Sequence, residues 1–165
     1  MKTKKLKLPT TLLLLLPLCL VLLGNGCDDD EDNYENISLE YTKCPCNSEM
    51  EFIKEITMDK ILLFDSTKTT LSDMQELSLV GDSSQFISYN PESNNAVYLL
   101  YFGLRRDIGY ICNFPKSASE WEIPSNGIYV SYNADVFESC NALGSIGGWI
   151  SYSDNILTSL KKYDK

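Results

Sequence analysis

The sequence predicts a mainly β domain, and three observations support this prediction. Short runs of strand-forming residues recur along the chain, and turn-forming pairs such as Asn90-Pro91, Asn126-Gly127 and Gly147-Gly148 separate or follow them. About 125 residues follow position 40, which is enough for one domain with one core. No repeat of fixed period is visible, so a solenoid or propeller is not expected. Many short strands of this kind favour a small antiparallel barrel or sandwich.

The first expected strands differ in their patterns. Lys60–Phe64 is a short apolar run, and Gln85–Tyr89 alternates between polar and apolar residues until Asn90-Pro91 ends it. Ala96–Phe102 is apolar on both faces, which predicts a central, buried strand. Ile108–Cys112 follows as a fourth strand.

A short helix is expected next, because Ser117 and Glu120 stand in capping-box spacing before Trp121. Trp121 is expected to be a packing anchor. After the Asn126-Gly127 turn, Gly127–Asn133 alternates cleanly, with Tyr129 and Tyr132 on opposite faces of the strand.

The C-terminal segment 155–163 fits both a helix and a strand, and we expect it to form a closing strand after the run Trp149–Tyr152. The segment 70–80 favours neither type of structure. The fold that fits best is a compact open barrel with one short helix, and an OB-like barrel is among the forms that fit.

Four cysteines of the domain, Cys44, Cys46, Cys112 and Cys140, predict two disulfides in an exported protein. Three connectivities are open, but a Cys44–Cys46 bond would close a strained ring. We therefore expect each of these two cysteines to reach Cys112 or Cys140. A redox role for Cys44-Pro-Cys46 and a four-cysteine zinc site are weaker alternatives.

The N-terminus indicates export. Four lysines precede an apolar run from Leu12 to Leu23, which small residues follow, as in a secretory signal peptide. The run is too short to span a bilayer, which needs roughly 20 apolar residues. Residues 1–26 are thus interpreted as a signal peptide.

The segment ending in Gly26-Cys27 resembles a bacterial lipoprotein signal, which implies that Cys27 is lipidated and becomes the N-terminus. The acids that follow, Asp28, Asp29, Asp30, Glu31 and Asp32, resemble the export signal of Bacteroidota surface lipoproteins. The alternatives are ordinary signal cleavage and a merely solvated acidic run. We expect residues 27–40 to be a lipidated tether, and residues 41–165 to form one domain at the outer membrane, facing the cell surface.

The composition excludes several functions. The net charge of −9 argues against nucleic acid as a partner, because binding requires neutralised phosphates. The chain has no histidine, so no Ser-His-Asp or Cys-His arrangement can form. It also has no phosphate-binding glycine loop. We expect a protein that is not an enzyme and that has no cofactor or metal.

Ten tyrosines suggest a recognition surface, and Tyr129 and Tyr132 are the candidate ligand-binding residues, although half-buried strand positions also favour tyrosine. Asp65-Ser66-Thr67 resembles an O-glycosylation acceptor, which implies a glycan on Ser66.

The segment 111–132, ICNFPKSASEWEIPSNGIYVSY, is similar to a pattern in small uncharacterised Bacteroidota lipoproteins, and that similarity implies no particular activity. The leading hypothesis is a binding or accessory module, for glycans in the first place. The alternatives are a protein–protein factor (an inhibitor, immunity or complex-assembly protein) and, third, a thiol-exchange protein.

Overall fold

We describe the fold from a computed structural model of the chain, which places residues 33–40, 44, 50–139 and 149–163. The expectations for Cys27, the acidic run 28–32, Cys46, Cys140 and Gly147-Gly148 fall outside these residues. All described strands and helices lie in one compact unit, Asn33–Lys165. No helix among the described residues is long and apolar enough to cross a membrane.

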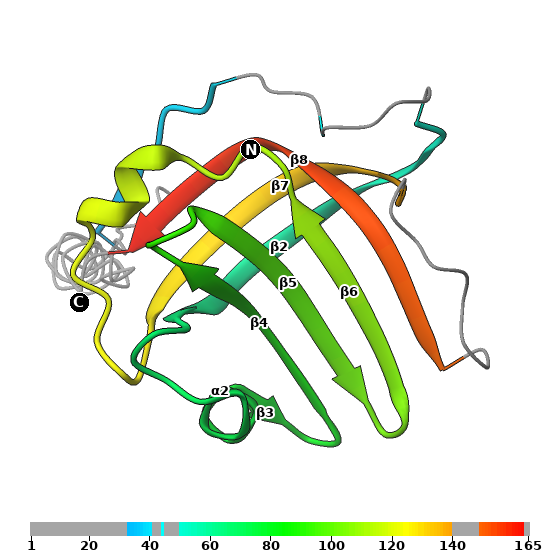
Figure 1. The fold of residues 1–165 in the computed structure, drawn as a ribbon, viewed down its shortest axis with the longest axis horizontal. Coiled ribbons are helices and arrows are strands. Elements are labelled where there is room, and N and C mark those ends of the chain that lie inside the picture. Colours follow the sequence, from blue (N-terminus) through cyan, green and yellow to red (C-terminus); the bar gives the residue numbers. More distant parts are fainter. Residues whose placement is uncertain (1–32, 41–43, 45–49, 140–148, 164–165) are drawn as a thin grey trace, which may run out of the picture. The chain divides into compact units, whose positions relative to one another are not determined.

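Six strands form a closed barrel (Figure 1). In chain order they are β2 (Phe52–Asp65), β4 (Ser83–Asn90), β5 (Asn95–Phe102), β6 (Arg105–Ile111), β7 (Ile128–Glu138) and β8 (Ile150–Tyr163). Their order around the barrel is β7-β2-β4-β5-β6-β8, and β8 pairs with β7 to close the ring. Closure satisfies the hydrogen bonds that an open sheet leaves at its edges. Two short strands are added outside the ring: β1 (Tyr34–Asn36) pairs with β8, and β3 (Leu79–Val80) pairs with β4.

The barrel is mixed, whereas the sequence pattern predicted an antiparallel one. β2 runs parallel to β4, and β6 runs parallel to β8. Parallel neighbours need a crossover connection. The helix α2 (Leu71–Leu77) and β3 lie in the connection from β2 to β4, and the connection from β6 to β8 includes β7. The barrel also has six strands, one more than an OB-like barrel.

Five predicted strand runs coincide with β2, β4, β5, β6 and β7, except that Cys112 follows the end of β6 and Gly127 precedes β7. The C-terminal segment is a strand, as expected. The predicted helix is only a 3-10 turn, η1 (Lys116–Glu120). A true α-helix, α2, forms in the undetermined 70–80 segment, where the Thr70 side chain accepts a hydrogen bond from the Asp73 amide as an N-cap.

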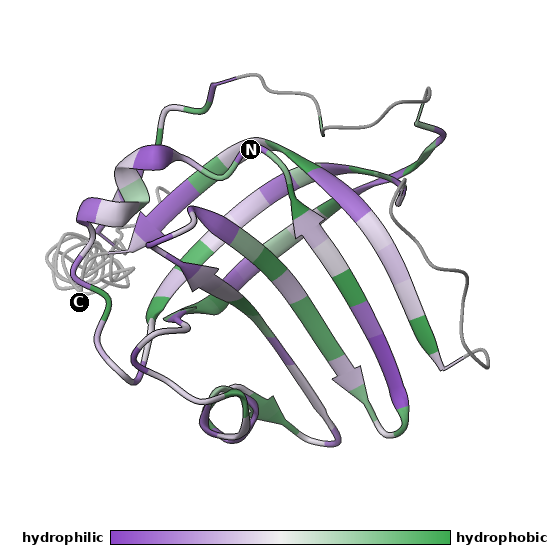
Figure 2. Ribbon diagram, viewed as in Figure 1, coloured by the Kyte–Doolittle hydropathy of each residue, from purple (hydrophilic) through white to green (hydrophobic). Residues whose placement is uncertain are grey.

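Buried residues alternate with more exposed ones along β7, as expected for a pleated sheet that is buried on one face. Hydrophobic and hydrophilic residues alternate along much of the barrel wall (Figure 2). A second, smaller cluster of Phe64, Met74 and Phe86 packs outside the barrel wall, with Met74 supplied by α2. The buried residues of the main core are Ile61, Leu63, Ile87, Tyr89, Ala96, Tyr98, Ile111, Phe114, Ala118, Ile123, Ile128, Val130, Tyr132, Ala134, Leu157 and Leu160.

One interior position requires glycine. A Cβ atom on Gly109 of β6 would lie 2.2 Å from the Nδ2 atom of Asn155 on the neighbouring strand β8. Asn155 is almost fully buried, so its side chain occupies the space that any larger residue at position 109 would need. Close approach between strands is a general reason for glycine inside a sheet.

Cys44 and Cys112 form a disulfide, with their Cα atoms 5.0 Å apart. The expectation that Cys44 reaches the C-terminal half is therefore confirmed, and one disulfide of the expected two is seen. The bond attaches the segment before β2 to the end of β6. The unit Asn33–Lys165 thus holds the closed barrel, its core and this disulfide, which gives it the contacts needed to fold by itself.

Candidate functional site

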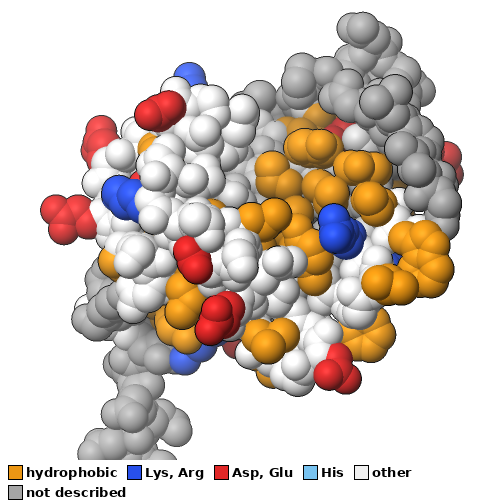
Figure 3. Space-filling view, turned by 60° about the horizontal axis from the view of Figure 1, so that its bottom comes forward, with side chains coloured by type: hydrophobic (Ala, Val, Ile, Leu, Met, Phe, Trp, Pro, Cys, Tyr) orange, Lys and Arg blue, Asp and Glu red, His pale blue; other side chains and the backbone are white. Residues whose placement is uncertain are grey.

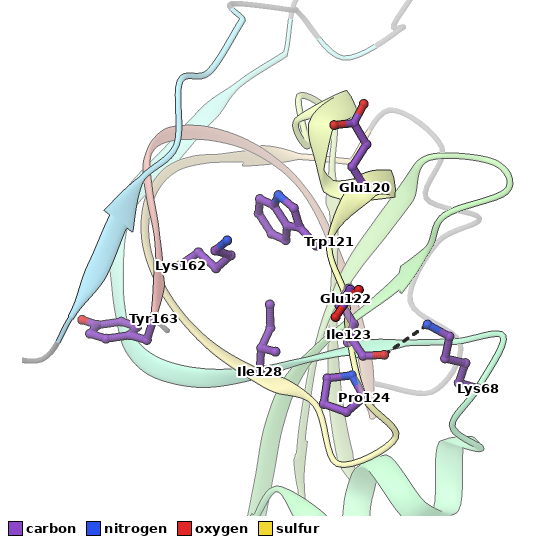
Figure 4. Close-up of a pocket in the computed structure, with 9 residues that line it drawn as sticks. All are labelled: Lys68, Glu120, Trp121, Glu122, Ile123, Pro124, Ile128, Lys162 and Tyr163. Atoms are coloured by element: carbon purple, nitrogen blue, oxygen red, sulfur yellow. Dashed lines mark hydrogen bonds between the residues drawn. The ribbon is translucent and has the colours of Figure 1, made fainter. Parts of the chain in front are cut away.

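A cavity of about 810 Å³ lies at the end of the barrel where β8 ends and β7 begins (Figure 4). We call this the cavity end. Its volume falls within the usual range of small-molecule sites. The walls come from η1 and the segment after it, from the turn after β2, and from the strand ends. The residues that line it are Lys68, Glu120, Trp121, Glu122, Ile123, Pro124, Ile128, Lys162 and Tyr163.

Trp121 is held in a fixed position in this cavity. Its backbone N–H donates to the Ala118 carbonyl at 3.1 Å, which closes the 3-10 turn. Its ring packs edge-on against Phe114, with the centroids 6.2 Å apart. The indole is nevertheless only half-buried, and Figure 4 shows it beside the cavity. Trp121 is therefore a rigid aromatic surface that a ligand can contact.

Two lysines flank the cavity, and each is engaged by an acid. Lys162 lies 5.6 Å from the centre of the Trp121 ring and pairs with Glu35 of β1 at 2.9 Å. Lys68 pairs with Asp65 at 3.0 Å and donates to the Ile123 carbonyl at 3.2 Å, the contact marked in Figure 4. These contacts place polar groups at fixed positions around the aromatic ring.

Asp65 holds the turn that carries Lys68. Its buried carboxylate accepts hydrogen bonds from the backbone N–H of Thr67 at 2.9 Å and from the Thr67 hydroxyl at 2.7 Å. Burial alone would raise the pKa of Asp65, but the bonds from Thr67 and the interaction with Lys68 outweigh burial and hold this pKa below its ordinary value. The carboxylate therefore stays charged at neutral pH and keeps Lys68 in place.

A strained bulge supports Tyr163 at the opposite wall. Lys60 has a φ of 46°, a conformation that is unfavourable for a residue other than glycine, and its N–H donates to the Ser131 hydroxyl at 2.8 Å. That hydroxyl donates to Asp59 at 2.6 Å and lies 3.0 Å from the Tyr163 hydroxyl. The bulge thus fixes the last aromatic residue of the cavity.

The structure separates the two tyrosines that sequence analysis selected. Tyr132 points into the barrel, where it is 1% exposed and packs against Tyr98 with the ring centroids 6.4 Å apart. No described group lies within hydrogen-bonding distance of its hydroxyl, and burial raises its pKa. Tyr129 lies on the outer face of β7 and is 50% exposed. Neither residue lines the cavity, and Tyr132 has the core position given as its alternative role.

Ser66 is exposed in the turn after β2, with its amide bonded to the Tyr89 carbonyl. Cys44 and Cys112 form the disulfide described above, whereas Cys27, Cys46, Cys140 and the acids 28–32 lie outside the described residues.

Trp121 was predicted to be a packing anchor, and its ring does pack on Phe114. The sequence did not indicate that the same ring also lines the cavity. The available signal was a tryptophan held between two prolines, Pro115 and Pro124, in a segment too short to bury it fully.

Within the described part of the chain, no group of three or more His, Cys, Asp or Glu side chains is arranged to hold a metal ion. Comparison with known proteins gave no match, either to a protein-family model or to a curated protein sequence.

Proposed function

We propose that this protein is a lipid-anchored binding module of the outer membrane that takes a glycan at the cavity end of its barrel. The observation that carries the proposal is the accessible, rigidly held ring of Trp121 in a cavity bordered by fixed polar groups. An aromatic face packs on the apolar face of a sugar ring, and flanking polar groups bind its hydroxyls.

The cavity groups suit binding better than catalysis. Lys68 and Lys162 are both held in ion pairs, and the chain has no histidine to carry a proton near neutral pH. Glu120 and Glu122 add carboxylate acceptors at the edge of the cavity, and such acceptors bind sugar hydroxyls directly. We therefore propose recognition without chemical conversion of the ligand.

The proposed anchor is the lipid on Cys27, with the acids 28–32 as the signal for transport to the cell surface. Five residues, 28–32, separate Cys27 from Asn33, and the six residue steps between the two span roughly 20 Å when fully extended. Tyr34 then pairs with Tyr163 at the end of β8, so the tether joins the domain at the cavity end. The domain is thus held close to the membrane that carries it.

We further propose that Cys46 and Cys140 form the second disulfide. The Cys44–Cys112 bond leaves these two cysteines as the remaining pair of the domain. Peptide mapping without reduction tests this directly. A fragment that links Cys46 to Cys140 is expected, and alkylation of both thiols in the folded protein would contradict it.

Tryptophan fluorescence tests the glycan site, because the chain has only two tryptophans, Trp121 and Trp149. In a Trp149→Phe variant of the unit Asn33–Lys165, Trp121 becomes the only reporter. A bound sugar is expected to change its emission, and Trp121→Ala is expected to abolish retention in gels that contain the same glycan. Tyr129→Ala is the control, since Tyr129 is exposed away from the cavity. Retention that survives Trp121→Ala, or no response across a broad glycan panel, would contradict the proposal.

A further inference from the structure

The opposite end of the barrel carries an exposed apolar surface. We call this the hairpin end, because β5 and β6 join there through Gly103-Leu104, with a φ of 56° at Gly103. The five most exposed large hydrophobic side chains among the described residues all lie there. They are Val80 (78%), Leu104 (75%), Phe102 (61%), Leu79 (58%) and Trp149 (57%).

Strand register places these residues at the same end of the barrel, with Phe102 on the inner face of the sheet and Leu79 on its outer face. Val80 pairs with Ser83, which pairs with Phe102, so β3, β4 and β5 form one row. Leu79 begins a second row, next to the first, which runs through Ser84 to Tyr101 and Arg106. The carbonyl of Trp149 accepts a hydrogen bond from the Arg106 amide at 2.8 Å, which places Trp149 beside the hairpin.

The surface continues along the outer wall of the barrel. Leu99, Ile108 and Tyr152 face outward at paired positions on β5, β6 and β8 and are only partly buried. The rings of Tyr110 and Tyr152 stack there at 6.5 Å, with 9° between their planes. An outward face of a small barrel in water is usually polar. In the view of Figure 3, hydrophobic side chains instead gather around a basic one on the face turned toward the reader.

The charge of this surface differs from that of the rest of the chain. The chain has a net charge of −9, yet its only two arginines, Arg105 and Arg106, follow the hairpin tip directly. Arg105 pairs with Asp107 at 3.1 Å. The Arg106 guanidinium lies 5.5 Å from the centre of the Tyr101 ring and pairs with no described carboxylate. Asp82 lies at the margin of the apolar surface, in the turn between β3 and β4.

We propose that this surface docks on a lipid bilayer that contains anionic headgroups. Phe102, Leu104 and Trp149 enter the interfacial region, and Arg106 binds a headgroup phosphate. Tryptophan and tyrosine are the aromatic residues favoured at the membrane interface, and a basic residue beside an apolar face is the usual pattern of surface-bound segments. This is a protein-borne contact in addition to any lipid on Cys27, and it does not depend on the glycan site.

The shape of the surface favours a bilayer over a protein partner. Most of its exposed side chains project from a two-residue turn and from strand ends, and of the five only Val80 lines one of the described pockets, a small one of about 120 Å³.

Co-sedimentation with vesicles tests the proposal, using the unit Asn33–Lys165 without a lipid. One vesicle type contains phosphatidylcholine alone, and the other also contains phosphatidylglycerol. Leu104→Ser is expected to lower the partition coefficient about tenfold on both types. Arg106→Gln is expected to lower it about fivefold on anionic vesicles only. Ile53→Ser and Lys54→Gln, exposed near the start of β2, are the matched controls and should bind like the parent protein.

A second readout uses Trp149 in a Trp121→Phe variant, where a blue-shifted emission on anionic vesicles is expected. Failure to bind either vesicle type would overturn the proposal, as would binding that Leu104→Ser and Arg106→Gln leave unchanged. A dimer in solution that Leu104→Ser dissociates, without vesicle binding, would assign the surface to a second copy of the chain. All variants keep their fold, because the changed side chains are exposed, and circular dichroism verifies this.

Discussion

Replacement of Tyr132 by phenylalanine should stabilise the protein. The Tyr132 side chain is 1% exposed, and its hydroxyl has no partner among the described residues. A buried hydroxyl without a hydrogen bond costs roughly 1–3 kcal/mol in proteins. Phenylalanine keeps the ring and its contact with Tyr98 and loses only the few dispersion contacts of one oxygen atom. We therefore expect the free energy of unfolding to rise by about 1–2 kcal/mol.

Tyr89→Phe is the matched control, because the hydroxyl of Tyr89 is also buried in the core but bonds to Asn94 at 2.9 Å. Its loss should lower the free energy of unfolding by about 1 kcal/mol. Urea unfolding followed by circular dichroism measures both variants, and the opposite signs are the critical result. If Tyr132→Phe costs as much as Tyr89→Phe, the hydroxyl has a partner and the reasoning fails.

Three further predictions concern stability. Gly109→Ala should lower the free energy of unfolding by about 1–3 kcal/mol, because the added methyl group overpacks against Asn155. Adding Asn155→Ala to this variant should recover part of the loss, as measured by urea unfolding. Removal of the Cys44–Cys112 bond, which joins residues 68 apart, should cost about 4 kcal/mol in the loop-entropy model, and equal unfolding midpoints with and without the bond would exclude this. The folded-state pKa of Asp65 lies below the ordinary 3.8, so its contribution to stability is present above about pH 4 and is lost as the pH falls through the folded-state pKa. Asp65→Asn should lower the free energy of unfolding by about 2 kcal/mol at pH 7. It should also make the loss of stability at acid pH less steep.

A fourth prediction concerns high pH. Burial, with a further contribution from Asp107, raises the pKa of Tyr98 from 10.0 to about 12, and burial raises that of Tyr132 as well. The unfolded chain releases these protons first, so stability is full below pH 10 and falls as the pH rises toward 12. Tyr132→Phe removes one of the two groups and should make this fall shallower, as urea midpoints across the range will show.

Period-two alternation predicted the strands where one face is buried and the other is polar. Gly127–Asn133 is such a case, and all of it except Gly127 lies in β7, with Tyr129 outside and Tyr132 inside. The pattern failed for the first half of β2, because Phe52–Lys60 is largely exposed on both faces and its charged residues interrupt the alternation. The parallel pairs β2–β4 and β6–β8 could not be predicted, since pairing depends on residues far apart in the sequence.

Apolar runs gave a different error. Ala96–Phe102 is apolar on both faces, which predicted a strand buried on both sides, and β5 is indeed central between β4 and β6. Its outer residues Leu99 and Tyr101, however, are only partly buried, and Phe102 is exposed. Hydropathy alone does not distinguish a buried face from an apolar surface that faces outward.

The candidate site could not be predicted from the sequence, because its residues lie far apart along the chain. Local pattern placed Trp121 in a short turn but could not show that Lys162 and Tyr163, at the far end of β8, lie beside the same cavity. Composition and spacing therefore predicted the kind of domain, a disulfide-bonded β domain with prominent aromatic residues. The position of the cavity depends on the closure of the barrel, which brings the ends of β7 and β8 together.

The most direct test of the central claim is a titration of the Trp149→Phe variant of the unit Asn33–Lys165 with a panel of polysaccharides and oligosaccharides, followed by the emission of Trp121. We expect a saturable change with at least one glycan, and we expect Trp121→Ala to remove binding of that glycan in the affinity gel. An unchanged emission across the panel, together with unretarded migration in every gel, would contradict a glycan site at the cavity end.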